Sequence, residues 1–184
     1  MDSCAAALLA GGKSSRMGED KSSLRLGNRT LLQHMSHLLN RAGLEKIYIS
    51  RSDIIPDEFP GHGPLSGVHA VLHHAMEHHT HLIFVPIDMP CLTSALIGGL
   101  MNAPSDNALV HYTSYPMPFR LAVKEQWYAL ADRLLHRAKD VSIKYFQSQI
   151  ENTLVLPVDD SDAHAFHNIN TSEEWRAFKK GEVL

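Results

Sequence analysis

The apolar run from Cys4 to Ala10, which ends directly at Gly11–Gly12, is the feature that most constrains the fold of this chain. An uninterrupted run rich in alanine and leucine is typical of a parallel strand that is buried on both faces. Adjacent glycines at the end of such a strand let the backbone approach a ligand without an intervening Cβ. Three cations, Lys13, Arg16 and Lys21, follow at close range. Backbone N–H groups and cations in this arrangement suit a polyphosphate, so the sequence predicts a buried strand followed by a phosphate-binding loop.

The rest of the chain continues this alternation of short apolar runs and longer segments of helical period. Residues 54–64 contain three prolines and are expected to form a loop. The βαβα order throughout the chain predicts an α/β fold, Rossmann-like, with three layers (α/β/α) and a mostly parallel central sheet. One domain over residues 1–184 suits a chain of this length with 44% apolar residues. The expected strands are residues 4–10, 46–50, 81–87, 107–112, 119–124 and 153–158, and the expected helices are residues 30–42, 65–79, 94–103, 126–138, 142–150 and 172–180.

Two well-known phosphate loops do not fit the glycine spacing after the first strand. The segment Gly12–Ser14 resembles the end of a Walker A motif, but Ala7 stands where that motif needs its first glycine. A dinucleotide fingerprint is also absent, because Gly11 and Gly12 are adjacent and the next glycine, Gly18, lies too far along the chain. The spacing therefore disfavours both a P-loop NTPase and a dinucleotide-binding enzyme.

A second polar feature, Asp88, follows the expected strand at residues 81–87. Ligands bind beyond the carboxyl ends of the strands in an open sheet of this kind, so Asp88 is expected to share a crevice with the glycine loop. A carboxylate beside a polyphosphate favours Mg²⁺, which commonly takes one or two protein carboxylates together with phosphate oxygens and water. The alternative is that Asp88 caps the turn before Pro90.

Several blocks of sequence together carry a resemblance to a known family. They are Leu9–Lys21 (Leu-Ala-Gly-Gly-x-Ser-x-Arg-Met-Gly-x-Asp-Lys), Gly63–Gly67 (Gly-Pro-Leu-Ser-Gly), Pro86–Pro90 (Pro-Ile-Asp-Met-Pro) and Asn168–Glu174 (Asn-Ile-Asn-Thr-Ser-Glu-Glu). In this order, the blocks resemble those of the MobA-like nucleotidyltransferases, and most closely those of the molybdenum cofactor guanylyltransferases. Since they span nearly the whole chain, the resemblance is to one complete domain.

The resemblance implies a reaction in which the terminal phosphate of molybdopterin, with or without bound molybdenum, attacks the α-phosphorus of GTP and expels pyrophosphate. Two anions must be neutralised and positioned, and no protein nucleophile is required. The resemblance also implies catalytic roles for Arg16, Lys21 and Asp88, with Mg²⁺ at Asp88. The implied GTP contacts are Leu9, Ala10, Gly11, Gly12, Lys21, Ser50, Asp57 and Asp88. The implied molybdopterin contacts are Arg16, Gly18, Gly63, Gly67, Asn168 and Asn170, although the two asparagines are alternatively a turn or a helix cap before Ser172.

The chain departs from the family pattern at the nucleoside side of the site. The family usually has an asparagine at the end of the second strand, where this chain has Ser50, and serine reaches less far than an amide. The connection from Arg51 to His62 is also shorter than the family's, which includes an aspartate that faces the base or ribose. Asp57 is the first candidate for that aspartate and Asp53 the second. These departures weaken the prediction that the base is guanine.

Composition excludes some partners. Lysine and arginine number 17 against 20 acidic residues, and the net charge of −3 leaves no basic footprint for nucleic acid. No apolar run approaches the roughly 20 residues that span a bilayer, and the N-terminus lacks a signal-peptide pattern, so no membrane partner and a cytoplasmic location are expected. Apoproteins of molybdoenzymes or their chaperones are candidate partners. Cys4 and Cys91 lack metal-type spacing and are expected to be reduced and buried.

Histidines gather in and after the expected helix at residues 65–79. Pairs four residues apart lie on one helical face and could bind Zn²⁺ or Ni²⁺, but no cysteine or acidic partner completes a site. The favoured interpretation is that they are solvated residues on the polar face of an amphipathic helix. The histidines in question are His69, His73, His74, His78, His79 and His81.

Two other functions stay open on the sequence alone. The first is a related nucleotidyltransferase, such as a molybdopterin cytidylyltransferase or an enzyme that acts on sugar or isoprenoid phosphates. The second is a non-catalytic nucleotide-binding adaptor that delivers the cofactor to molybdoenzymes. The presence of Arg16, Lys21 and Asp88 argues against the adaptor, and release of pyrophosphate distinguishes it from the enzymes.

Overall fold

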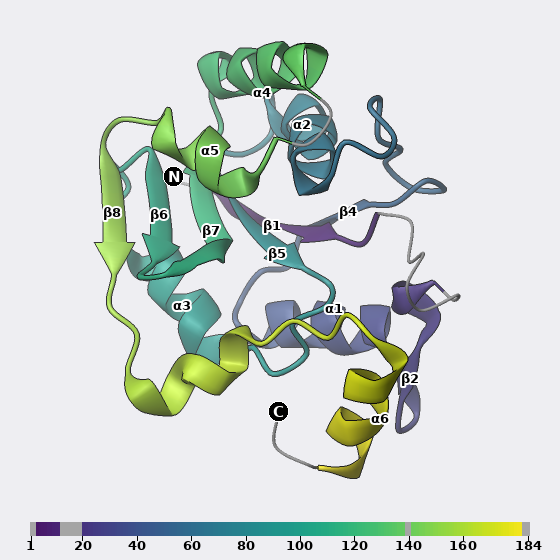
Figure 1. Cartoon of the computed structure of the whole chain (residues 1–184). Helices are drawn as coiled ribbons and strands as arrows, with labels where there is room; N and C mark the ends of the chain where they lie inside the picture. Colours follow the sequence, from purple (N-terminus) through teal and green to yellow (C-terminus); the bar gives the residue numbers. More distant parts are fainter. Residues whose placement is uncertain (1–2, 12–19, 139–140, 182–184) are drawn as a thin grey trace.

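The computed structural model describes residues 3–11, 20–138 and 141–181, and its centre is a six-stranded sheet (Figure 1). The strand order is β4-β1-β5-β7-β6-β8. The central strand β1 pairs in parallel with β4 on one side and β5 on the other, and β6 pairs in parallel with β8. The strands are β1 (Cys4–Leu9), β4 (Ile47–Ser50), β5 (His81–Pro86), β6 (Leu109–Tyr112), β7 (Tyr115–Ala122) and β8 (Thr153–Leu156).

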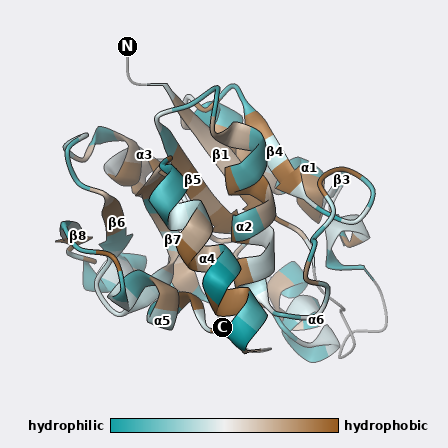
Figure 2. Ribbon diagram, turned by 90° about the horizontal axis from the view of Figure 1, so that it is seen from above, coloured by the Kyte–Doolittle hydropathy of each residue, from teal (hydrophilic) through white to brown (hydrophobic). Residues whose placement is uncertain are grey.

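Helices cover both faces of this sheet, which confirms the expected three-layer α/β/α architecture (Figure 1). One face carries α1 (Leu31–Arg41), α3 (Ser94–Asn102) and α6 (Ser172–Lys180), and the other carries α2 (Pro64–Ala75), α4 (Glu125–Arg137) and α5 (Ile143–Ser148). Figure 2 shows β1 and β5 in apolar colours and polar bands on α4, which lies in front of the sheet in that view. Residues 5–8 of β1 are fully buried, as expected for a strand covered on both faces.

The expectation of βαβα order throughout is wrong for β6 and β7. These strands form an antiparallel hairpin, and β7 is also antiparallel to β5. Only Thr113 and Ser114 separate the two strands, and Ser114 has a φ of 67°. Two residues suffice for a tight hairpin turn, whereas a parallel pair needs a crossover of a dozen residues or more. The sheet is therefore mixed, with β7 the antiparallel strand.

Local signals set the ends of the helices. Thr30 caps α1 and Thr171 caps α6, each in a capping box with the glutamine or glutamate three residues later. Pro64 occupies the first turn of α2, where its missing N–H has no intrahelical partner to lose. That helix ends at Ala75 rather than at the expected His79. Short elements that were not expected are η1 (Lys21–Ser23), the β2 (Arg25–Leu26) and β3 (Arg29–Thr30) hairpin, and η2 (Asp160–Phe166).

The prediction that the histidines are solvated is wrong for His69 and His81, which are buried. The His69 ring is 0% exposed, stacks on Tyr128 with a centroid distance of 4.6 Å, and places Nε2 3.4 Å from Asp132 Oδ1. Tyr128 and Asp132 belong to α4, which packs over the face of α2 that the sequence pattern assigned to solvent. His73, His74 and His78 are exposed, as expected.

Two further expectations concern cysteines and membranes. Cys4 and Cys91 are free thiols, as expected, but both are half-buried rather than buried. Desolvation raises the pKa of Cys4 to about 11 and also raises the pKa of Cys91. Within the part of the chain that the structure describes, no helix has the length and apolar character that a membrane crossing requires.

Candidate functional site

The candidate site lies at the edge of the sheet where β1, β4 and β5 end. Because these strands are parallel, their carboxyl ends meet at this edge, and the chain passes from β1 outward to β4 and then to β5 on the other side. Such a reversal of strand order is where open α/β sheets bind ligands. A first hollow of about 230 Å³ is lined by Leu9, Ala10, Gly11, Lys21, Pro64, Pro86, Ile87, Asp88, Met89, Met117 and Asn168.

A second hollow, of about 430 Å³, adjoins the first at Ala10 and Gly11. It opens on the side of β4 and contains several charged groups. The site is therefore elongated, with one end beside Lys21 and Asp88 and the other beside Asp57. Its lining residues are Ala10, Gly11, Asp20, Arg51, Ser52, Pro56, Asp57, Pro60 and Gly61.

Lys21 joins two of the predicted site residues in the first hollow. Its Nζ donates to Asp88 Oδ2 and to Asn170 Oδ1, at 3.0 Å in each case. The backbone supports this arrangement, because the Ile169 N–H donates to the Asp88 carbonyl at 2.8 Å. Residues from the start, middle and end of the chain thus converge on a single ammonium group.

The start of α6 fixes the position of Asn170. Glu174 Oε2 accepts from the Asn170 N–H at 2.6 Å and from the Thr171 N–H at 3.0 Å, and these two bonds lower the pKa of the Glu174 carboxyl. Thr171, rather than either asparagine, supplies the side-chain cap of the helix. The alternative of Asn170 as the helix cap is therefore wrong, since its side chain faces Lys21. Asn168 is exposed and lines the first hollow.

Ser50 and Asp57 form a pair at the second hollow. Ser50 is 1% exposed, and its Oγ donates to Asp57 Oδ1 at 3.0 Å. The other carboxylate oxygen, Oδ2, lies 3.3 Å from the position that a Cβ on Gly11 would take. A side chain at position 11 would therefore crowd the carboxylate, and glycine leaves room for this close approach.

Asp53, the other candidate for the nucleoside-facing aspartate, is held outside by Arg51. Arg51 Nε and Nη2 donate to the two carboxylate oxygens of Asp53 at 2.6 and 2.9 Å. This fork of hydrogen bonds lowers the pKa of Asp53 and raises that of Arg51. Asp53 does not line either hollow, whereas Asp57 does. The geometry favours Asp57.

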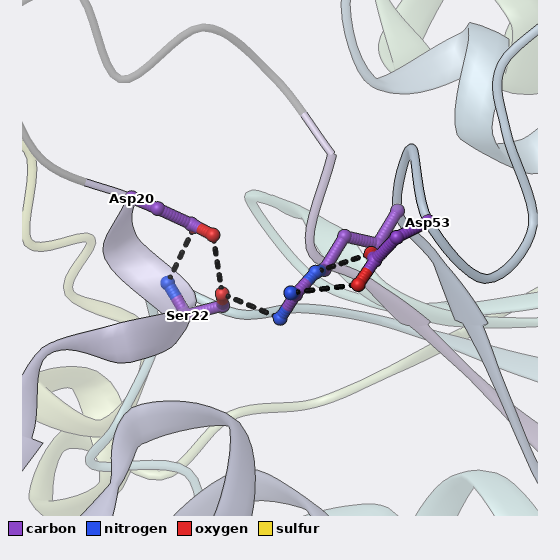
Figure 3. Close-up of polar contacts among 4 residues, drawn as sticks. Asp20, Ser22 and Asp53 are labelled. Atoms are coloured by element: carbon purple, nitrogen blue, oxygen red, sulfur yellow. Dashed lines mark hydrogen bonds and ion pairs between the residues drawn. The ribbon is translucent and has the colours of Figure 1, made fainter.

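Arg51 also reaches the segment that carries Lys21. Figure 3 shows Asp20 and Ser22 of this segment together with Asp53. Arg51 Nη1 donates to Ser22 Oγ at 3.0 Å, and Ser22 donates from N and Oγ to the two carboxylate oxygens of Asp20. Sequence reasoning missed Ser22 and Arg51 altogether. The pair Asp20 and Ser22 has a readable signal, because Asp caps a short helical turn by accepting from the N–H two residues on, but no pattern marks Arg51.

The structure explains why glycine stands at positions 63 and 67 without reference to a ligand. Gly63 precedes α2 with a φ of 76°, a region that favours glycine. Gly67 is buried within α2, and a Cβ there would lie 2.7 Å from Ser50 Oγ and 3.1 Å from Leu9 Cδ2. Neither glycine lines a hollow, so contact with molybdopterin stays a prediction for both. Gly12, Arg16 and Gly18, together with Lys13, lie outside the described residues.

The oxygens that hold Lys21 are of the type that Mg²⁺ prefers. A carboxylate oxygen and an amide oxygen converge on one cationic group, so the site already stabilises positive charge between Asp88 and Asn170. Among the described residues, no three His, Cys, Asp or Glu side chains gather closely enough to hold a metal ion by themselves. These donors therefore fit a cation that also takes ligands from a bound phosphate chain.

Comparisons with known proteins show the family of the chain. A family model described as "MobA-like NTP transferase domain" matches residues 6–152. A "Molybdenum cofactor guanylyltransferase" from Xanthomonas euvesicatoria pv. vesicatoria is 37% identical over 91% of this chain and 90% of its own length. One of the same name from Rhizobium johnstonii is 31% identical over 92% of this chain and 88% of its own.

Solved structures share the fold at lower identity. The "Molybdopterin-guanine dinucleotide biosynthesis protein A" of Archaeoglobus fulgidus has a TM-score of 0.69 at 19% identity and covers 95% of this chain, with 96% of its own chain covered. A 4-diphosphocytidyl-2C-methyl-D-erythritol synthase from Anaerococcus prevotii has a TM-score of 0.71 at 12% identity, over 98% and 95% of the two chains. The names of these two proteins describe different activities, so the shared fold alone does not select an activity for this chain.

Proposed function

The chain belongs to the MobA-like NTP transferase family, and from that premise we propose that it is a molybdenum cofactor guanylyltransferase. It transfers GMP from GTP to the phosphate of molybdopterin or of the molybdenum cofactor and releases pyrophosphate. One observation carries the assignment within the structure. Lys21 Nζ contacts Asp88 and Asn170, so three sequence blocks that the family shares meet at one point.

The chemistry needs charge and position rather than a protein nucleophile. An oxygen of the acceptor phosphate forms a bond to the α-phosphorus of GTP as the bond from that phosphorus to the bridging oxygen of the β-phosphate breaks, and pyrophosphate leaves. Lys21 offers positive charge at the phosphates, and the backbone at Leu9–Gly11 offers N–H donors that no side chain obstructs at Gly11. Arg16, which lies outside the described residues, is proposed as a further cation.

We place the metal at Asp88. Asp88 would hold Mg²⁺ together with phosphate oxygens. The point between Asp88 Oδ2 and Asn170 Oδ1 holds the Lys21 ammonium. When bound, Mg²⁺ supplies neutralisation of the triphosphate charge. The contribution of the chain is to fix the two oxygens, which it does through the Ile169 bond to the Asp88 carbonyl and the Glu174 bond to Asn170.

The nucleoside belongs in the second hollow. Asp57 presents one carboxylate oxygen beside Gly11 while Ser50 donates to the other, so the carboxylate is oriented before a ligand arrives. A carboxylate accepts from paired donors, and the hydroxyls of a ribose or the N–H groups of guanine supply such pairs. The product is expected to pass to molybdoenzyme apoproteins or their chaperones, in the cytoplasm.

The decisive assay measures Mg²⁺-dependent pyrophosphate release from GTP, CTP, ATP and UTP, with and without molybdopterin. GTP-selective and pterin-dependent release is the expected result. Selectivity for CTP would instead assign a cytidylyltransferase, and nucleotide binding without release would assign an adaptor.

A substitution ties this activity to the site. Asp88→Ala is expected to lower turnover by roughly a hundredfold or more, the scale for loss of a main electrostatic element. Asp106→Ala is the matched control, because Asp106 is exposed and precedes β6 at the opposite edge of the sheet. Near-normal turnover of Asp88→Ala would refute the metal and catalytic roles, provided that its thermal unfolding matches that of the control.

A further inference from the structure

The connection between β4 and Asp57 is a tight turn that begins at Arg51. The Arg51 N–H donates to the Ile55 carbonyl at 3.0 Å, and the Ile54 N–H donates back to the Arg51 carbonyl at 3.0 Å. The turn reverses the chain within five residues, so Asp57 returns to the end of the strand and meets Ser50. The position of the nucleoside-facing pair therefore depends on this turn.

The Arg51 guanidinium connects the turn to a distant segment. Two of its nitrogens hold Asp53 within the turn, and the third donates to Ser22, which is 1% exposed and bound to Asp20 (Figure 3). Its planar fork of donors can contact both partners at once, which the single ammonium of a lysine does less well. A continuous chain of hydrogen bonds thus runs from the turn to the segment that contains Lys21.

These hydrogen bonds lie between the two ends of the site, the phosphate end at Lys21 and the nucleoside end at Asp57. Lys21, next to Ser22 in the chain, faces Asp88 in the first hollow, whereas Asp57 lines the second. Arg51 lines the second hollow with Asp20 and Asp57. Arg51 joins the segment at the phosphate end to the segment at the nucleoside end, so it contributes to the separation between these two ends.

We infer that Arg51 is a positioning residue that sets the spacing between Lys21 and the Ser50–Asp57 pair, so that one GTP molecule engages both at once. This inference rests on the proposed function for the identity of the ligand. GTP is a phosphate chain linked to a nucleoside, and the second contact of a linked ligand forms at a high effective concentration only when the geometry of the two sites matches the linker. Loss of the Arg51 side chain removes that match, whereas the backbone bonds of the turn and the Ser50–Asp57 bond do not use the guanidinium.

The test compares GTP with its two halves. Dissociation constants of GTP, guanosine and inorganic tripolyphosphate are measured by calorimetry for the wild type and for Arg51→Met. For Arg51→Met we expect GTP to bind about tenfold more weakly, while guanosine and tripolyphosphate each change less than about twofold, since effective concentration affects only the linked ligand. Arg176→Met is the control, because it removes an arginine paired with a glutamate on an exposed face of α6 and should change none of the three constants.

Each other outcome overturns the inference. Unchanged GTP binding would show that Arg51 sets no spacing, and equal weakening of GTP and guanosine, or of GTP and tripolyphosphate, would show that Arg51 contacts that half itself. Ser22→Ala provides a second route that leaves the turn intact, and it should weaken GTP in the same way. The double variant should be no weaker than Arg51→Met, because both substitutions break one connection. Pterin-dependent pyrophosphate release by the wild type tests the proposed function separately, so a failure of either claim is recognised on its own.

Discussion

Replacement of Gly67 by alanine tests whether this glycine is required for packing or for contact with the pterin. The resemblance to the family implies a molybdopterin contact, whereas the structure places Gly67 inside α2 against the end of β4. A new Cβ would lie 2.7 Å from Ser50 Oγ, 3.1 Å from Leu9 Cδ2 and 3.3 Å from Ser50 Cβ. The shortest of these distances is below real Cβ contacts, so an atom must shift, and we expect the Ser50 hydroxyl to move and to lose its bond to Asp57.

The expected magnitude follows from three contributions. Overpacking of a close-packed site costs about 1–3 kcal/mol, and loss of a hydrogen bond from a buried hydroxyl costs roughly 1 kcal/mol more. The higher helix propensity of alanine returns about 1 kcal/mol. The net loss in the free energy of unfolding is therefore about 2 kcal/mol, which in a domain of this size lowers the Tm by roughly 4–8 °C.

The assay is thermal or denaturant unfolding, combined with the dissociation constant for GTP. Gly98→Ala is the matched control, since a Cβ on this helical glycine of α3 meets no atom within 4 Å. That variant should gain about 0.5–1 kcal/mol from reduced entropy of the unfolded chain. Adding Ser50→Ala to Gly67→Ala should recover part of the stability, because the closest atom is then gone. If Gly67→Ala keeps wild-type stability and GTP affinity but loses pterin-dependent turnover, the packing argument is wrong and the pterin contact is correct.

Further predictions concern charge and burial elsewhere in the chain. Lys21→Ala should lower both GTP affinity and turnover, because in the proposed role the ammonium contacts phosphates in the ground state and the transition state alike; unchanged binding by calorimetry would contradict that role. Burial lowers the pKa of His69 below 6.5, so around and just below that pH the unfolded chain binds more protons than the folded one, and stability should decline as pH falls. Unfolding between about pH 5 and 7.5 should show a shallower decline for His69→Gln. With its pKa raised to about 11, Cys4 should react slowly with iodoacetamide at neutral pH until the protein is unfolded.

The layered fold could be predicted because apolar runs report burial directly. The run at residues 4–10 became β1, and the last helix begins and ends where its capping residues indicate, at Ser172–Lys180. An apolar run does not show whether a strand is parallel or antiparallel to its neighbours. The β6–β7 hairpin has a turn without glycine, so its two apolar runs looked like separate parallel strands. The burial of His69 was also hidden, because a helical period shows which residues share a face but not whether a second helix covers it.

The position of a site residue could be predicted from the sequence where the strand that precedes it could be predicted. Asp88 follows a strongly apolar strand, so its place at the carboxyl edge was implied by the sheet, and the structure brings it to Lys21 and Asn170. Asp57 and Asp53 could not be separated by sequence, since they differ only by which way a short turn directs them. The two hydrogen bonds from Arg51 to Asp53 decide that. Arg51 also donates to Ser22, a residue 29 positions away and beyond the reach of any local pattern.

Ser50 and the short connection after it act together to position the carboxylate of Asp57. Ser50 Oγ already lies close to the backbone of Gly67, so a longer side chain that points the same way would collide with α2. Ser50 is also almost fully buried and donates its hydroxyl hydrogen to Asp57, which the tight turn opened by Arg51 returns to the end of β4. A small residue therefore orients the carboxylate, and the carboxylate provides the reach that an asparagine side chain would otherwise supply. We therefore propose that the departure at Ser50 shifts the nucleoside contact to Asp57, so that the site keeps its capacity to bind a nucleoside.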